Sequence, residues 1–329
     1  MNNNRRSFIK KAAFATLGMN LLSRNMMAAK STIAVPAGKR IGMVGLDTGH
    51  CMAFTQSLNA TDVGNKYRGY QVTAAYPKGT EFIREWKDRI PQITKEMKEQ
   101  GVEIVDSMDE LLNKVDVVML TCIDGNKHLE LATPIIKARK TLFIDKPFAA
   151  SYKDAVAIVE LAKQYQTPMF SSSSLRYMDG IDTITESVGK VNGADVFSPA
   201  YLEPSHPDLF WYGIHGVEIL FAVMGAGCKS VKRTYTQDTD YVVGVWNDNR
   251  IGTYRGIRNG HNGYGATVFG EKAIRVLDKY GGYNPLLVKI IEFYDTKTIP
   301  FPVEQTLEII AFMEAAEESK NKGGIAIGM

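Results

Sequence analysis

A short segment near the start of the chain combines residue types that could hold the phosphates of a dinucleotide. An apolar run over residues 41–44 is followed by Gly45, where a buried strand would turn tightly into a helix. Asp47 and His50 occupy the next two positions at which such a turn normally has glycine. A carboxylate repels a pyrophosphate unless its side chain points away or a cation lies between them. The segment therefore predicts the strand–turn–helix unit more strongly than it predicts the cofactor.

The residues in front of this segment have the composition of an export signal. Arg5 and Arg6 precede eleven weakly apolar residues, 12–22, and no acidic residue occurs before Asp47. This order is typical of a twin-arginine signal peptide, and eleven residues are too few to span a bilayer, which needs about 20. We expect a periplasmic or otherwise exported protein, cleaved between residues 23 and 39, with no stable membrane span.

The composition argues against several classes of partner. Residues 1–38 hold six basic residues and no acidic one, so the rest of the chain carries 33 basic against 36 acidic residues. This balance gives no reason to expect nucleic acid or an anionic membrane surface as a partner. Cys51, Cys122 and Cys228 show no metal or disulfide spacing and are interpreted as small core or turn residues.

The elements that would position these residues fall into two patterns. From residue 39 to residue 168, apolar strands alternate with amphipathic helical stretches, as in a doubly wound parallel sheet of the Rossmann type. The expected strands cover residues 41–44, 72–76, 102–105, 115–121 and 141–144, and the expected helices cover residues 81–100, 108–113, 127–138 and 152–165. We therefore expect residues 39–168 to form an N-terminal Rossmann domain of the dinucleotide-binding kind.

Residues 169–329 have a β-rich pattern instead. The expected strands cover residues 194–198, 231–236, 241–246, 252–257, 266–269 and 274–277. Residues 247–250 fit a hairpin connection, and residues 303–320 have the spacing of an amphipathic helix. Consecutive antiparallel strands would leave one face of a sheet open. The expected fold class is thus α/β, with a signal peptide and linker over residues 1–38 and a C-terminal α+β domain whose sheet is open and mainly antiparallel.

Three segments resemble motifs of one oxidoreductase family. Residues 145–147, Asp-Lys-Pro, are similar to the Glu-Lys-Pro motif of the glucose-fructose oxidoreductase and inositol dehydrogenase family (Gfo/Idh/MocA). His128 lies eighteen residues before Lys146, as the family's His-containing helix start does. Residues 212–218, which include His215, resemble the segment that supplies the family's catalytic histidine. Together the three motifs extend over nearly the whole mature chain.

The resemblance implies hydride transfer between NAD or NADP and a hydroxyl of a sugar, glycoside or cyclitol. By position, Lys146 would lie between nicotinamide and substrate, and His215 would act as acid and base on the reacting hydroxyl. The expected substrate-binding residues are Arg176, Trp211, Tyr212 and His215. The expected cofactor-binding residues are Gly45, Asp47, Thr48, Gly49, His50, Lys78, Asp124, His128 and Lys146.

Two further expectations accompany the resemblance. A cofactor bound tightly in the cytoplasm could travel with the folded enzyme through the twin-arginine route and be recycled within one turnover. The open C-terminal sheet resembles the surface by which family members pair, so we also expect a homo-oligomer.

Departures from the family pattern keep other functions open. The end of the second strand has Lys78 where an acidic residue normally binds the ribose, which favours the 2′-phosphate of NADP. Asp124 stands where the family commonly has Pro-Asn beside the nicotinamide, and Trp211 replaces its aspartate. His215 and Glu218 could supply two metal ligands, but without a convincing third ligand we expect no metal site. The alternative is a non-redox carbohydrate-binding or metal-dependent protein on an inherited Rossmann scaffold.

Overall fold

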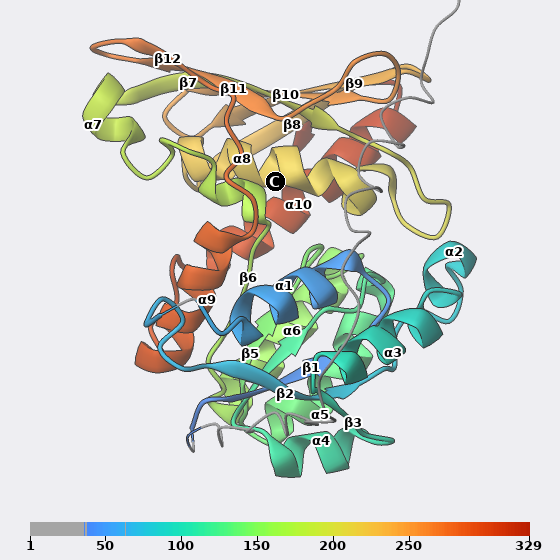
Figure 1. The fold of residues 1–329 in the computed structure, drawn as a ribbon. Coiled ribbons are helices and arrows are strands. Elements are labelled where there is room, and N and C mark those ends of the chain that lie inside the picture. The colour runs from blue at the N-terminus through green and yellow to red at the C-terminus, as the bar shows by residue number, and fades with distance from the viewer. Residues whose placement is uncertain (1–35, 37, 63) are drawn as a thin grey trace, which may run out of the picture. The chain divides into compact units, whose positions relative to one another are not determined.

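The computed structural model describes residues 36, 38–62 and 64–329. The predicted signal peptide lies outside these described residues. No helix within the described ranges is long and apolar enough to cross a membrane. The described residues form one compact unit, in which a parallel sheet and a mixed sheet are each covered by helices (Figure 1).

The first sheet has six parallel strands in the order β3-β2-β1-β4-β5-β6, which is the Rossmann order. The strands are β1 (Arg40–Val44), β2 (Gln71–Tyr76), β3 (Glu103–Ile104), β4 (Val117–Leu120), β5 (Thr141–Ile144) and β6 (Met169–Ser171). Nearly all side chains of β1, β4 and β5 are buried because helices cover both faces of the sheet. The predicted parallel sheet is therefore confirmed.

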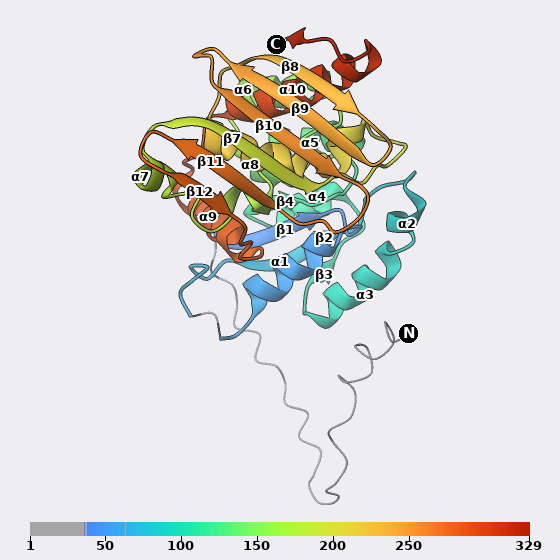
Figure 2. The ribbon, with the colours of Figure 1, turned by 90° about the horizontal axis from the view of Figure 1, so that it is seen from above.

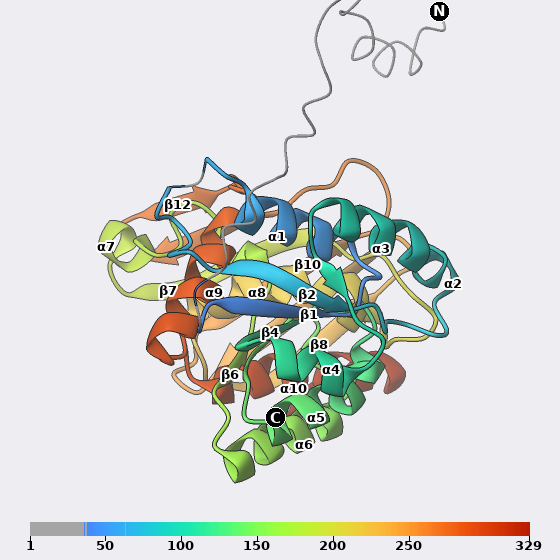
Figure 3. The ribbon, with the colours of Figure 1, turned by 60° about the horizontal axis from the view of Figure 1, so that its bottom comes forward.

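The helices of this part divide between the two faces of the sheet. They are α1 (Gly49–Asn59), α2 (Arg84–Lys87), α3 (Ile90–Glu99), α4 (Met108–Lys114), α5 (His128–Lys137) and α6 (Tyr152–Tyr165), and a 3₁₀ turn, η1 (Gly125–Lys127), precedes α5. Helices α1 and α3 lie on one face, whereas α4, α5 and α6 lie on the other (Figure 3). The single helix expected over residues 81–100 is in fact two helices, α2 and α3. Pro91, in the first turn of α3, explains the break because its ring and missing N–H are tolerated only at a helix start.

The second sheet has seven strands in the order β12-β11-β7-β10-β9-β8-β13. They are β7 (Val191–Pro199), β8 (Cys228–Tyr235), β9 (Thr239–Trp246), β10 (Ile251–Ile257), β11 (Gly265–Gly270), β12 (Ile274–Leu277) and β13 (Ile327–Gly328). The hairpin predicted at residues 247–250 joins β9 to β10. All neighbours are antiparallel except β7 and β10, which are parallel, so the sheet is mixed and mainly antiparallel (Figure 2).

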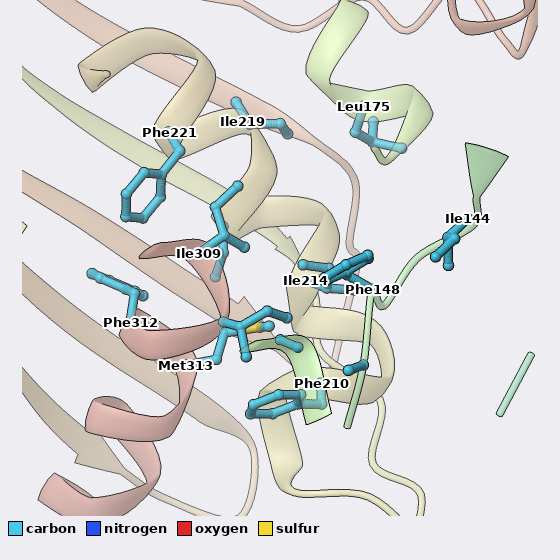
Figure 4. Close-up of a cluster of buried hydrophobic side chains, with 14 of the residues drawn as sticks. Ile144, Phe148, Leu175, Phe210, Ile214, Ile219, Phe221, Ile309, Phe312 and Met313 are labelled. Atoms are coloured by element: carbon cyan, nitrogen blue, oxygen red, sulfur yellow. The ribbon is translucent and has the colours of Figure 1, made fainter. Parts of the chain in front are cut away.

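Two helices join the second sheet to the first. They are α8 (Ile214–Met224) and α10 (Val303–Asn321), and α7 (Ile184–Val188) is a shorter neighbour. Figure 4 shows apolar side chains of α8 and α10 packed together near Ile144, the last residue of β5, and Phe148, in the segment that follows this strand. Full burial of each such side chain contributes about 1.5–3 kcal/mol. This continuous core fixes the end of β5 relative to the start of α8.

One C-terminal helix packs on the parallel sheet. Helix α9 (Asn284–Thr296), which the sequence pattern did not predict, contributes Leu287 and Ile290 to the same apolar cluster as Ile41 of β1. The hydroxyl of Tyr294 donates to the carbonyl oxygen of Val118 at 2.7 Å. These contacts hold the segment between β12 and α9 beside the carboxyl-terminal ends of the parallel strands.

Candidate active site

A pocket of about 250 Å³ lies where β1, β4, β5 and β6 end. This edge of a parallel sheet is where ligands bind in Rossmann folds. The lining is mostly aromatic, hydroxylic or basic and consists of Thr48, Gly49, His50, Trp86, Ile123, Lys146, Ser174, Leu175, Trp211, Tyr212, His215, Tyr264, Tyr280 and Tyr283. Since pockets that bind drug-sized ligands usually measure roughly 300–1,000 Å³, this smaller pocket suits a small molecule.

Lys146 enters this pocket directly after β5. It is 9% exposed, and the Lys146–Pro147 peptide bond is cis. Burial lowers the pKa of the Lys146 ammonium, although the charge of Asp145 acts in the opposite direction. The Asp145 carboxylate accepts a hydrogen bond from the backbone N–H of Lys146 at 2.8 Å. The predicted Asp-Lys-Pro turn thus places a desolvated ammonium in the pocket.

His50 is paired with the same carboxylate. Its Nδ1 lies 2.5 Å from Oδ2 of Asp145, and its ring meets that of Tyr283 edge-on at 4.9 Å. Burial alone would raise the pKa of Asp145, but the neighbouring His50 and Lys146 lower it. The sequence predicted His50 near the site but missed this pairing, because the two residues are 95 positions apart.

His215 faces Lys146 from the first turn of α8. A π-helical turn, η3 (Leu209–Gly213), leads into this helix, and Gly216 lets it lie against Tyr254, since a Cβ at Gly216 would overlap the Tyr254 ring. The Nδ1 of His215 is 2.7 Å from the hydroxyl oxygen of Ser173. Burial, followed by the charges of Lys146 and His50, lowers the pKa of His215 well below its usual value. The imidazole is therefore neutral at neutral pH and able to accept a proton.

Four tyrosines complete the pocket. The hydroxyl groups of Tyr212 and Tyr264 are 3.0 Å apart, and that of Tyr280 is 2.7 Å from Ser174 Oγ. Burial raises the pKa of Tyr283 to about 12 and that of Tyr280 in the same direction, so these hydroxyls stay protonated. Sequence reasoning found only Tyr212, because the other three lie outside any motif and reach the pocket through the tertiary fold.

Arg176 lies away from this pocket. It forms a buried ion pair with Glu218 at 3.1 Å, and its guanidinium stacks 3.7 Å from the centre of the Phe301 ring. It lines a separate hollow of about 870 Å³ that includes neither Lys146 nor His215. Glu218 also accepts a hydrogen bond from the backbone N–H of Ser173 at 3.3 Å. Arg176 thus supports the segment whose Ser173 hydroxyl holds His215.

Two other expected cofactor residues, His128 and Asp124, are buried outside the pocket lining. His128 contacts the backbone oxygens of Cys122 at 2.7 Å and Phe148 at 3.1 Å through its two ring nitrogens. Asp124 accepts a hydrogen bond from the Thr80 hydroxyl at 3.0 Å. Neither side chain lines the pocket.

All three cysteines are free and buried, as the sequence predicted. In the part of the chain that the structure describes, no three His, Cys, Asp or Glu side chains are grouped so that they could hold a metal ion. Glu218, one of the two ligands considered from sequence, is already bonded to Arg176.

The turn after β1 keeps the first glycine of the dinucleotide-binding pattern, Gly45, and has Asp47 in place of the second. Gly45 has φ of +87°, and a Cβ there would lie 2.5 Å from the backbone nitrogen of Cys122, so only glycine fits. Asp47 is fully buried, with hydrogen bonds from the backbone N–H groups of Thr80 at 2.6 Å and Ile123 at 2.9 Å. Burial raises the pKa of Asp47, and these bonds act against that rise. The carboxylate thus joins the segments that follow β2 and β4.

Comparison with known proteins finds a family model that matches the N-terminal part of the chain. Residues 39–172 match the model of an oxidoreductase family with an NAD-binding Rossmann fold, Gfo/Idh/MocA. The match lies in the part of the chain that forms the parallel sheet. A myo-inositol 2-dehydrogenase of Thermotoga maritima is 28% identical over 127 residues, which cover 37% of this chain and 38% of that protein. The curated relatives that match are thus covered over at most 40% of their own length.

Solved structures resemble the chain over a larger share of its length. The myo-inositol 2-dehydrogenase of Lactobacillus plantarum superimposes with a TM-score of 0.71 at 13% identity, covering 88% of this chain and 99% of that chain. The scyllo-inositol dehydrogenase of Lactobacillus casei, solved with NAD(H) and scyllo-inositol, has a TM-score of 0.69 at 14% identity, covering 88% and 98%. At these identities the likeness shows the fold, and it confirms the predicted two-sheet architecture.

The site has room for the pyrophosphate of the family's cofactor at the start of α1, but its adenosine end is closed by the segment after β2. In the Rossmann turn, a pyrophosphate lies at the amino end of the first helix, and here Thr48 and Gly49 at that end of α1 line the pocket beside Lys146. The ribose of a dinucleotide lies between the turn and the end of the second strand. In this structure the bond between Asp47 and Thr80 bridges that interval, so the adenosine end requires the segment after β2 to move. Lys78 is paired with Glu81 at the surface of this segment.

Proposed function

We propose that this protein is an NAD(P)-dependent oxidoreductase acting on a hydroxyl of a small sugar, glycoside or cyclitol. The observation that supports this best is the meeting of Lys146 and His215 in one pocket of about 250 Å³. The match of residues 39–172 to an oxidoreductase family with an NAD-binding Rossmann fold supports the redox chemistry. The inositol dehydrogenases among its structural neighbours support a cyclitol or sugar as the substrate class.

His215 is the proposed acid and base. If Nδ1–H donates to the Ser173 oxygen, Nε2 keeps a free lone pair that can accept the proton of a substrate hydroxyl. The Lys146 ammonium stabilises the negative charge that develops on the oxygen as the proton leaves. Thr48 and Gly49 would hold the cofactor beside Lys146, and its nicotinamide would supply the hydride acceptor for oxidation of the alcohol to a carbonyl. In the reverse direction, protonated His215 returns the proton.

The aromatic lining provides the proposed sugar-binding surface. Trp86 and Trp211 meet edge-on with ring centres 6.3 Å apart, and Tyr212 lies beside them in the same pocket. Rings of this kind pack against the C–H faces of sugars, while the tyrosine hydroxyls bond to substrate hydroxyls. The expected roles of Trp211 and Tyr212 as substrate contacts fit this arrangement.

The first experiment identifies the nucleotide and measures turnover. The mature chain is purified without added cofactor, denatured and examined by mass spectrometry for NAD or NADP, and a panel of sugars and cyclitols is then screened for reduction of each. Lys146→Met and His215→Asn should each lower kcat about 100-fold or more. Lys163→Met, an exposed residue paired with Glu160 on α6, is the matched control and should retain activity. Wild-type turnover in Lys146→Met and His215→Asn would refute the proposal.

A non-redox carbohydrate-binding protein is the second candidate. It is favoured by the hydrogen bond between Asp47 and Thr80, which closes the adenosine end of the dinucleotide site. This function predicts no bound nucleotide, no nucleotide reduction with any sugar, and ligand affinity that survives Lys146→Met. Nucleotide identification and the screen of sugars and cyclitols therefore separate the oxidoreductase from the carbohydrate-binding protein.

Export and self-association are also proposals. Export by the twin-arginine route rests on Arg5 and Arg6, and Lys substitution of both should leave the protein in the cytoplasm on cell fractionation. Self-association through the second sheet rests on exposed apolar side chains of its strands, among them Ile251, Ile274 and Val276. Light scattering of an Ile251→Lys variant should show a smaller species than the wild type.

A further inference from the structure

A row of aromatic rings leads from the pocket to the surface of the protein. The ring of Tyr212, which lines the pocket, meets that of His215 edge-on at 5.0 Å between ring centres. Tyr212 also meets Tyr201 edge-on at 5.0 Å. Exposure rises along this row, from 5% for His215 to 44% for Tyr201. Tyr201 is not among the lining residues, so it continues the aromatic surface outside the pocket.

Two chain segments meet both inside the pocket and outside it. Tyr201 and Tyr212 belong to the segment that leads from β7 into η3, and Asn262 and Tyr264 belong to the connection between β10 and β11. Inside the pocket, the hydroxyl oxygens of Tyr212 and Tyr264 are 3.0 Å apart. Outside it, the Nδ2 of Asn262 donates to the hydroxyl oxygen of Tyr201 at 2.8 Å. The two segments therefore form one wall that extends from the pocket to the solvent.

The outer pair of this wall, Tyr201 and Asn262, is held in place although Tyr201 is exposed. The ring of Tyr201 contacts Tyr212 while its hydroxyl is bonded to Asn262. The segment after Tyr201 is anchored as well, since the Nδ2 of Asn126 donates to the carbonyl oxygen of Ser205 at 3.2 Å. A side chain that is already ordered loses little conformational entropy when a ligand covers it. The outer pair is thus a preformed surface.

The polar groups of the outer pair match those of a sugar. Tyr201 accepts the bond from Asn262 and keeps its own O–H as a donor. The Oδ1 of Asn262 takes part in none of the hydrogen bonds that the structure describes, so it is left as an acceptor. A tyrosine also presents an apolar ring face beside its hydroxyl. The outer pair therefore offers a donor, an acceptor and a flat apolar face, which together suit a pyranose ring.

The outer pair belongs to a different part of the fold from the cofactor position. Thr48 and Gly49, beside which the pyrophosphate would lie, precede and begin α1 next to the parallel sheet. Tyr201 and Asn262 follow strands of the second sheet. A ligand on the outer pair therefore extends the substrate side of the pocket.

We propose that Tyr201 and Asn262 form a second sugar-binding subsite, and that the substrate is a disaccharide or a longer glycoside. One ring occupies the pocket beside His215 and Lys146. The next ring, joined to the first through a glycosidic bond, packs on Tyr201 and bonds to Asn262. The pocket of about 250 Å³ is smaller than those of drug-sized ligands, so the second ring lies outside it. This inference rests on the proposed function, because it names the substrate class of the same site.

Calorimetric titration of the mature chain tests the proposal by comparing single rings with the disaccharides that contain them. The single rings are D-glucose, D-galactose, D-mannose, D-xylose and myo-inositol, and each is compared with α- and β-linked compounds in which it carries a second ring. Every titration is run with and without saturating NAD⁺ or NADP⁺. We expect at least one disaccharide to bind about tenfold more tightly than its single ring. A panel in which no second ring improves binding would overturn the proposal.

Four variants locate the second ring. Tyr201→Ala should lower the affinity for the preferred disaccharide about tenfold and leave that for the single ring unchanged, because the pocket lining is intact. Tyr201→Phe and Asn262→Ala, which each remove one polar group, should lower it about threefold. Tyr152→Ala, at a tyrosine of similar exposure that begins α6, is the matched control and should bind both sugars as the wild type does. An equal loss for single ring and disaccharide in Tyr201→Ala would overturn the proposal, since Tyr201 would then only support Tyr212.

A second copy of this chain is the other ligand that an exposed tyrosine suits. Light scattering of Tyr201→Ala therefore accompanies the titrations. A species smaller than the wild type, with unchanged sugar affinities, would assign Tyr201 to an interface between copies and overturn the subsite.

The proposed function can fail separately from this inference. A preference for a disaccharide that depends on Tyr201, without reduction of NAD⁺ or NADP⁺ by any sugar, would refute the redox function and leave the subsite intact. Oxidation of single sugars or cyclitols with no gain from a second ring would do the reverse.

Discussion

Replacing Asp47 by glycine should open the adenosine end of the dinucleotide site. Asp47 stands at the second position of the glycine-rich turn, and its carboxylate holds the segment after β2 through the backbone of Thr80. Gly79 of that segment packs directly on the carboxylate, because a Cβ there would overlap it. Asp47→Gly removes the side chain that links the glycine-rich turn to the segment after β2. Among the described hydrogen bonds, no other side chain of the turn bonds to that segment.

The size of the effect follows from the hydrogen bond that must be given up. A hydrogen bond to a charged group contributes about 1.5–3 kcal/mol. If the dinucleotide must displace Thr80 from Asp47, the wild type loses this amount of binding free energy. Since 1.4 kcal/mol corresponds to a factor of ten, Asp47→Gly should bind NAD⁺ or NADP⁺ about 10- to 100-fold more tightly. The same variant should unfold at a lower temperature, since Ile123 also loses its acceptor.

Isothermal titration of nucleotide-free protein with NAD⁺ and NADP⁺ measures this gain. Asp47→Asn is the matched control, because it keeps the shape and one acceptor while it removes the charge, and it should fall between the wild type and Asp47→Gly. Gly79→Ala leaves Asp47 in place but pushes the segment away from it, so it should also raise the affinity. Folded Asp47→Gly protein that binds both nucleotides no more tightly than the wild type would refute the reasoning.

Three other predictions concern stability and the position of His215. Because the pKa of buried His215 is lowered, the unfolded chain binds a proton below about pH 6.5 that the native chain does not. Stability conferred by the neutral imidazole is thus present above that pH and lost below it, by up to about 1.4 kcal/mol per pH unit, and denaturant titrations should show a shallower decline in His215→Gln. Arg233→Met should lower the unfolding free energy by about 3–5 kcal/mol, because Arg233 is buried and its loss leaves the equally buried Asp240 with one cation fewer. Arg250→Met, in an ion pair with the exposed Asp248, should change it little. Ser173→Ala should lower kcat about tenfold and alter its pH profile with little change in KM, and a parallel rise in KM would instead indicate a binding role.

The sequence predicted the elements whose signals are local. Strand β5 and helix α6 occur at the predicted residues, because an uninterrupted apolar run marks the strand and Ser151 caps the helix through the backbone N–H of Asp154. Helix α9 was missed although it has an apolar face. That face packs on a sheet formed by residues more than 100 positions earlier in the chain. The sequence near α9 therefore gives no sign of the surface that the helix covers.

The candidate site was predictable to the extent that its residues belong to motifs. Lys146 and His215 were expected from their segments, and the structure brings both into one pocket. Tyr264 and Tyr280 belong to no motif, and their place in the lining depends on where β11 begins and β12 ends relative to α9. Arg176 was expected to contact the substrate because of its position in the sequence. In the structure its guanidinium is paired with Glu218, and it does not line the pocket.

The departures from the family pattern are connected to each other by hydrogen bonds. Asp47 and Asp124 both bond to Thr80, one through its backbone N–H and the other through its hydroxyl. His50, at the third position of the turn, bonds to Asp145, which stands where the family has glutamate. Random loss of a cofactor site would leave isolated substitutions with unpaired polar groups, which are costly when buried. Here the departures form two sets, and within each set the buried polar groups are hydrogen-bonded to one another.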